Sequence, residues 1–272
     1  MSGTSVNASR WQRDLRVPSG RYGFANAARM EWVKLRSLRS TFWALLLAVV
    51  GMVAIGVVTM ANTKAPSPDK AAAFDATNNV LAGVAVGQLL IGALGVLVVT
   101  GEYASGTIRS TFAAVPDRRL VLSAKAAVYG GVSLALGEAV AFVTFFAGRT
   151  ALGDGVPRPG IGDAGVLRAV LMAGAYLAMI GLIGIGIGAI TRHTASAIAV
   201  LVGVTFVLPA VIGGVSGTAV AKFFPTIIAA NSLAVAKPVS GVLSPWAGFA
   251  LLCLYTAAVL LVGGRLLTRR DA

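Results

Sequence analysis

The groups best suited to polar chemistry lie in one short segment, residues 101–119, which reads GEYASGTIRSTFAAVPDRR. Only 12% of the chain is charged, yet this segment holds Glu102, Arg109, Asp117, Arg118 and Arg119. Carboxylate and guanidinium groups form charge-assisted hydrogen bonds, which contribute about 1.5–3 kcal/mol each when they are desolvated. We expect Glu102 and Arg109 to make such bonds at the surface of a protein partner.

A second candidate is Glu138, which lies deep in an apolar stretch, SLALGEAVAFVTFF. A charged carboxylate near the middle of a membrane costs roughly 2.5–3.5 kcal/mol on insertion scales. Three arrangements would lower this cost: the carboxyl group is protonated, because burial disfavours its charged form; it bonds a polar group on another helix, such as Gln88; or it faces a water-filled substrate path. We name Glu138, Gln88 and Asn231 as the candidate path residues.

The sequence lacks the residues that several other chemistries require. A P-loop needs a glycine followed by lysine and serine or threonine, and no lysine here follows a glycine. A chain with one histidine and one cysteine cannot form a histidine-based metal cluster or an internal disulfide. We expect no catalytic residues, no metal site and no cofactor, so that the chain itself is not an enzyme.

The composition indicates a membrane protein. The 272 residues are 57% hydrophobic, with a mean hydropathy of +0.82, and soluble domains carry about 25% charged residues. Several uncharged runs reach the roughly 20 residues that cross a bilayer, and they do not alternate as strands of an outer-membrane barrel do. We predict an all-α polytopic protein. The net charge of +13 reflects basic flanks of apolar runs and not a nucleic-acid partner.

Six spans are predicted, at residues 42–61, 80–100, 124–147, 166–190, 195–214 and 246–267. Pro209 predicts a kink in the fifth span. Between the fifth and sixth spans, residues 223–236 are apolar but too short to cross. We interpret them as an external or re-entrant element that dips into the membrane, with a loosely packed loop as the alternative. Glycine pairs 83/87 and 184/188 predict close helix contacts.

An amphipathic helix precedes the first span. Residues at spacings of three and four form one apolar stripe, with basic residues off it: Phe24, Ala28, Trp32, Leu35, Leu38 and Phe42. We expect residues 23–41 to lie in the membrane interface against lipid headgroups. Residues 1–22 form a disordered basic tail, 42–268 the transmembrane domain and 269–272 a short tail.

A short helix is also predicted between the second and third spans. Ile108, Phe112 and Val115 fall on one side of a helical turn, Pro116 ends the helix, and Asp117 caps the next one. Lysine and arginine in the flanks number 16 on this side of the membrane and 7 on the other. By the positive-inside rule both termini and this helix are cytoplasmic.

Two of these segments carry a family resemblance. EWVKLRSLRSTFW before the first span and GEYASGTIRSTFAAVPDRRLVLSAK after the second resemble the permease subunits of bacterial ABC-2 type transporters. The resemblance implies an exporter in the bacterial cytoplasmic membrane, built as a homodimer or heterodimer of permeases, with ATP hydrolysed by a separately encoded ATPase. It also implies that the ATPase contacts the entry helix and a coupling helix, through Glu31, Lys34, Glu102, Tyr103, Gly106, Thr107, Ile108, Arg109 and Phe112.

Two other functions stay open from the sequence. An ion-coupled secondary transporter would need several ionisable groups at membrane depth, and only Glu138 qualifies. The second open function is that of a membrane protein without transport activity, such as an immunity or scaffold subunit. An ATPase that co-purifies with the chain would favour the exporter over both.

Overall fold

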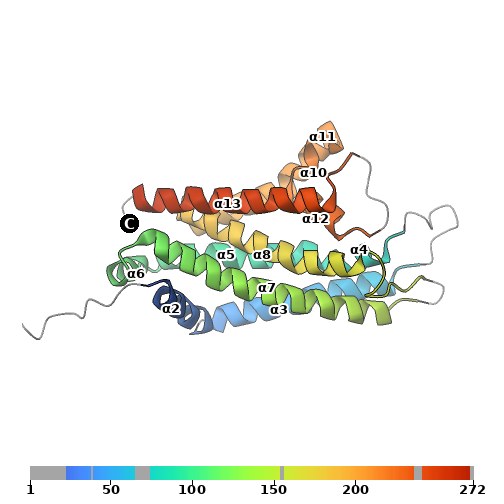
Figure 1. Ribbon diagram of the computed structural model, residues 1–272, viewed down its shortest axis with the longest axis horizontal. Helices are drawn as coiled ribbons and strands as arrows, with labels where there is room; N and C mark the ends of the chain where they lie inside the picture. The colour runs from blue at the N-terminus through green and yellow to red at the C-terminus, as the bar shows by residue number, and fades with distance from the viewer. Residues whose placement is uncertain (1–22, 38, 65–73, 154–155, 236–240, 270–272) are drawn as a thin grey trace, which may run out of the picture.

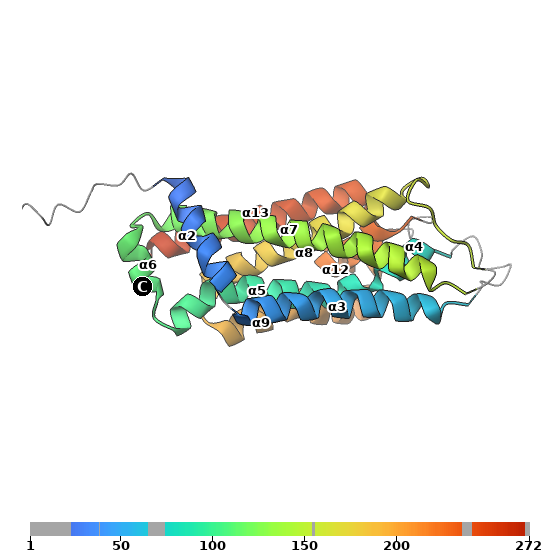
Figure 2. The ribbon, with the colours of Figure 1, turned by 90° about the horizontal axis from the view of Figure 1, so that it is seen from below.

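A computed structural model describes the fold over residues 23–37, 39–64, 74–153, 156–235 and 241–269. These residues form helices and contain no strand, and six of their helices are long and apolar enough to cross a membrane. The long helices run side by side along the longest axis of the molecule (Figures 1 and 2). The predicted fold class, an all-α polytopic membrane protein, is confirmed.

All six predicted spans are present, and most extend beyond their predicted ends. The spans are Phe42–Ala61 within α3 (Arg39–Ala61), Ala76–Ala104, α7 (Arg118–Thr150), α8 (Val166–Thr191), Thr194–Ser216 and α13 (Pro245–Arg269). The second span contains α4 (Ala76–Val80), η2 (Leu81–Gly83) and α5 (Val84–Ala104). It starts before the predicted residue 80 because the Asp75 carboxylate caps α4, accepting the N–H of Asn78 at 2.9 Å.

Helix α8 occupies the centre of the bundle and packs against α5, α7 and α13. Its contact with α5 depends on glycine. A Cβ atom on Gly95 would lie 2.1 Å from the carbonyl oxygen of Gly181, and one on Gly184 would lie 2.3 Å from that of Gly92. The backbones can approach this closely only without side chains. The predicted pair 184/188 lies in this contact, whereas the predicted pair 83/87 packs against Met52 of α3.

The fifth span bends through a π-helical turn. It consists of α9 (Thr194–Val202), the π-turn η3 (Gly203–Val207) and α10 (Leu208–Ser216). Pro209 has no N–H to donate to the carbonyl four residues earlier, which belongs to Thr205. The Thr226 hydroxyl donates to that carbonyl instead. The irregularity predicted at Pro209 is therefore present, and a neighbouring helix satisfies the freed backbone oxygen.

The segment before the sixth span is packed into the bundle. Two short helices, α11 (Thr218–Ala221) and α12 (Pro225–Leu233), follow the fifth span, and α12 contacts α8 and α13. Ile228, Asn231 and Leu233 of α12 are buried. This packing excludes the alternative of a loosely packed loop.

Helix α2 (Phe24–Ser37) crosses one end of the bundle at a steep angle to the long helices (Figure 2). One face, with Ala27 and Glu31, is buried against α7, whereas the apolar side chains of Phe24 and Trp32 are 48% and 49% exposed. The apolar stripe is thus available to lipid, as an interfacial helix requires. The predicted tail, residues 1–22, and the side chain of Leu38 lie outside the described residues.

Candidate functional site

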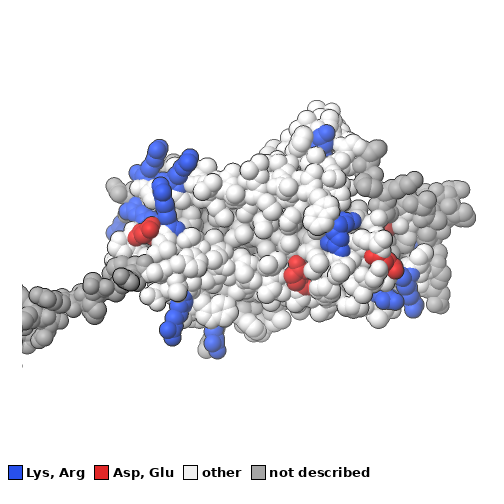
Figure 3. Space-filling model, viewed as in Figure 1, with Lys and Arg blue, Asp and Glu red and all other residues white. Residues whose placement is uncertain are grey.

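Helix α2 and the three consecutive helices α5, α6 (Ile108–Ala114) and α7 meet at a largely buried group of polar and charged side chains. We call Glu31 and Lys34 of α2, Glu102 of α5, Thr111 of α6 and Lys125 of α7 the charge cluster. It lies at the end of the bundle that carries α2, α6 and the last turns of α13 (Figure 1). Lysine and arginine gather on the surface at this end, while the middle of the same face is nearly uncharged (Figure 3).

Lys125 is the most deeply buried cation of the charge cluster. Its side chain is 2% exposed, and its ammonium group donates to Glu31 Oε2 at 2.7 Å and to Glu102 Oε1. An unpaired ammonium at this depth would be strongly destabilising, since burial removes its hydration. The buried position of Lys125, about two turns inside α7, therefore requires the two carboxylates.

Lys34 closes the cluster from the side of α2. Its Nζ lies 3.0 Å from Glu31 Oε1, 2.9 Å from Glu102 Oε1 and 3.0 Å from Thr111 Oγ1. Burial by itself lowers the pKa of the Lys34 ammonium, but its hydrogen bonds and attraction to Glu102 and Glu31 outweigh burial and raise that pKa above its usual value. Lys34 consequently stays charged throughout the neutral range.

Helix α6 is attached to the bundle by its inner face. The Thr111 hydroxyl donates to Glu102 Oε2 at 3.1 Å, and Ile108 is 5% exposed. Phe112 lies under the guanidinium of Arg118, 5.1 Å from its ring centroid, and Arg118 donates to the Leu267 carbonyl at 2.9 Å. These contacts join α6 to α5, α7 and the end of α13.

The two ends of α6 follow from local sequence. Gly106 joins α5 to α6 with a φ of +72°, a left-handed conformation that a residue with a side chain adopts only with strain. After α6, Val115 is extended as expected for the residue before Pro116. Asp117 then caps α7, accepting the N–H groups of Arg119 at 3.0 Å and Leu120 at 3.2 Å, which confirms the predicted cap.

The outer face of α6 and of the turn before it is free for a partner. Its exposed residues are Gly106, Thr107, Arg109, Ser110, Ala113 and Ala114. Tyr103, by contrast, faces the bundle, with the Arg192 guanidinium 5.3 Å from its ring centroid. The predicted coupling residues are therefore divided between the charge cluster, with Glu31, Lys34 and Glu102, and an outward surface, with Thr107 and Arg109.

Glu138 lies against the central helix. Its carboxyl carbon would be 2.5 Å from a Cβ atom on Gly174 of α8, so the glycine provides the space that the carboxyl group occupies. Its Oε2 is buried without a hydrogen-bond partner among the described residues. The predicted alternative of a bond to Gln88 is not formed: the Gln88 Nε2 donates to the Ala85 carbonyl at 3.2 Å, and its Oε1 accepts the hydroxyl of Tyr176.

The three predicted path residues have separate surroundings. Gln88 joins α5 to α8 through Tyr176, and both side chains are buried. Asn231 of α12 donates to the carbonyl of Leu243, just before α13, and its Oδ1 is buried without a partner in the described part of the chain. The described residues contain no hydrogen bond between any two of Glu138, Gln88 and Asn231.

Sequence analysis missed two members of the charge cluster, Thr111 and Lys125. Lys125 had a signal, because it lies inside the apolar run that begins at residue 124, and a lysine within such a run needs a partner. No sequence signal pointed to Thr111, since threonine is common on short helices.

The fold and the charge cluster together define a multi-pass α-helical membrane protein with a basic end. Residues 27–208, more than half of the chain, match the family model described as ABC-2 family transporter protein. The chain belongs to this family, which implies a membrane transport subunit that associates with an ABC ATPase. A search of curated proteins gives no significant match.

Replacing Lys125 tests the charge cluster. Lys125→Met leaves two buried carboxylates with one cation, and breaking a buried pair costs about 3–5 kcal/mol. We expect a large drop in the thermal unfolding midpoint in detergent. Adding Glu31→Gln restores charge balance, so the double variant should lose less than the sum of the two single losses.

Lys64→Met is the matched control for this experiment, because Lys64 is exposed outside the bundle. It should change the unfolding free energy by no more than about 0.5 kcal/mol. Equal midpoints for Lys125→Met and Lys64→Met would show that the charge cluster does not stabilise the fold.

Proposed function

We propose that the chain is the permease subunit of an ATP-binding cassette exporter, in which a separate ATPase subunit docks on the outer face of α6. The proposal rests on the difference between the two faces of α6. Its inner face contacts α5 through Thr111 and α7 through Phe112, while its outer face, with Thr107 and Arg109, is exposed. A helix built this way can receive a force from a soluble partner and pass it to the spans.

The charge cluster gives the route of that force. Glu102 bonds Lys125 of α7, Lys34 of α2 and Thr111 of α6. A displacement of α6 would therefore act on α2, α5 and α7 together. We propose that closure of the ATPase dimer on ATP pushes on α6, and that these helices then rock against the others to switch the permease between inward-open and outward-open states.

The proposed arrangement in the membrane follows the same reasoning. The end with α2, α6 and the α13 terminus faces the cytoplasm, in agreement with the excess of lysine and arginine there. A second permease, identical or related, completes the transport path, as the family resemblance implies. The fifth span supports this proposal, because it exposes apolar side chains to its surroundings, including Val207, Val211 and Val215.

Arg109→Ala tests the docking surface. The side chain is exposed on α6 and has no place in the charge cluster, so the variant should fold like the parent protein. Loss of one charge-assisted hydrogen bond at the interface should weaken ATPase association by about tenfold or more. Affinity purification in mild detergent, with the amount and ATP hydrolysis of the co-purified ATPase as readouts, measures this loss.

Arg269→Ala is the control, since Arg269 is an exposed arginine at the same end but on α13. It should leave the association unchanged. If no P-loop ATPase co-purifies with the parent chain, the exporter is not the function. If one does, and Arg109→Ala retains it fully, docking occurs elsewhere.

For the substrate path we propose that Glu138 lines it and favours polar or cationic cargo, with Gln88 and Asn231 along the same route. The Glu138 carboxyl is partly exposed, and its Oε2 is buried without a hydrogen-bond partner among the described residues, which leaves this oxygen available to a polar ligand. Glu138→Gln keeps the shape of the side chain and removes its charge. We expect normal folding and basal ATPase activity with a loss of transport in reconstituted vesicles.

Glu138→Ala is the companion variant. If Glu138→Gln transports normally while Glu138→Ala folds poorly, the carboxyl group is a packing element and the path lies elsewhere.

A further inference from the structure

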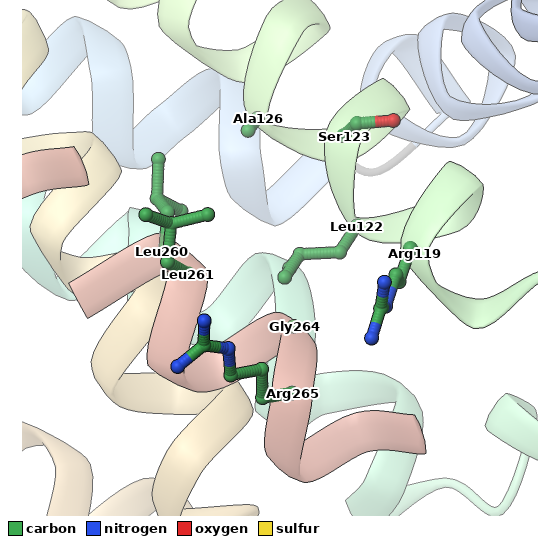
Figure 4. A pocket seen from close by; sticks show the side chains of 8 residues that line it. All are labelled: Arg119, Leu122, Ser123, Ala126, Leu260, Leu261, Gly264 and Arg265. Carbon is green, nitrogen blue, oxygen red and sulfur yellow. The ribbon is translucent and has the colours of Figure 1, made fainter. Parts of the chain in front are cut away.

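A groove lies between α7 and α13 near the charged end of the bundle. Its walls are mainly apolar, with Leu122 and Ala126 from α7 facing Leu260 and Leu261 from α13 (Figure 4). Its volume is about 460 Å³, within the range of small-molecule sites. Gly264 forms part of its wall, and a Cβ atom there would lie 3.6 Å from Leu122 Cδ2, an ordinary contact.

Two arginines flank this apolar groove. Arg119 lies in the first turn of α7 and Arg265 near the end of α13, and their guanidinium groups lie on either side of Gly264 in Figure 4. Both side chains are exposed, and neither makes an ion pair within the described ranges. The nearby Asp117 carboxylate is used to cap α7. The groove therefore combines two cations with an apolar wall.

We propose that this groove binds an anionic glycerophospholipid, with its phosphate between Arg119 and Arg265 and an acyl chain against Leu122, Leu260 and Leu261. The chemistry of each part matches: guanidinium groups form bidentate bonds to phosphate oxygens, and the leucines bury hydrocarbon. Basic pockets between membrane helices at the cytoplasmic side bind anionic headgroups in this way.

The position of the groove supports the same occupant. It lies at the end of the bundle where α2 exposes Phe24 and Trp32, which is the level expected for headgroups. A soluble anion would gain nothing from the leucine wall, and a zwitterionic lipid would place its own cation near two arginines. The site should therefore prefer net-negative over zwitterionic phospholipids. This inference does not depend on ATP-driven transport.

The test compares lipid retention by native mass spectrometry, using the full chain in micelles that contain phosphatidylglycerol or phosphatidylcholine with identical acyl chains. The parent protein should retain phosphatidylglycerol preferentially. Arg119→Gln/Arg265→Gln should lower that retention by roughly 30-fold, from about 1 kcal/mol for each cation near an anionic surface. Arg29→Gln/Arg36→Gln on α2, matched in charge and exposure, should leave it unchanged.

A second pair of variants tests the groove itself. Gly264→Phe fills the groove and leaves both arginines in place, so retention of phosphatidylglycerol should fall. Gly264→Ala should still retain phosphatidylglycerol, because the added Cβ atom makes only an ordinary contact. Equal losses in the two arginine double variants would mean only general attraction of lipid to a basic surface. Unchanged retention in Arg119→Gln/Arg265→Gln would overturn the site, and would leave the two arginines to a protein partner.

Discussion

The ammonium group of Lys125 imposes the constraint on which this end of the molecule depends. A side chain that is 2% exposed cannot keep its charge without counter-charges. The two carboxylates that supply them come from α2 and α5, and one of them also holds α6 through Thr111. Satisfying one buried cation thus fixes the relative positions of four helices that the chain connects by short turns or long spans.

Different interactions hold the rest of the bundle together. In its central part, contact between α5 and α8 is made by backbones that approach at glycine, without charges or many polar bonds. Where a backbone bond is lost, at Pro209, a threonine from another helix replaces it. Close backbone packing therefore stabilises the apolar middle of the bundle, and ion pairs stabilise its charged end. Helix α6 is joined to the long helices by the charge cluster and by the Phe112–Arg118 contact.

Much of the architecture could be predicted from sequence, because membrane spans are long apolar runs and their lengths are set by the bilayer. The same is true of the Asp117 cap and the helix between the second and third spans, which depend on residues close in sequence. The charge cluster could not be predicted, because Glu31, Glu102 and Lys125 are brought together only by tertiary packing. For that reason Glu102 was expected at a partner surface, and its carboxylate is instead paired within the chain.

Hydrogen–deuterium exchange of Glu102→Gln in lipid nanodiscs tests the central claim, that the charge cluster joins α2 and α6 into one mechanical unit. This variant keeps the side-chain shape and removes the charge that Lys34, Thr111 and Lys125 share. Backbone amides of α2 and α6 should exchange faster together, while those of α12, which lies outside the cluster, should keep the rate of the parent protein. Unchanged exchange in α6 of the folded variant would contradict the account.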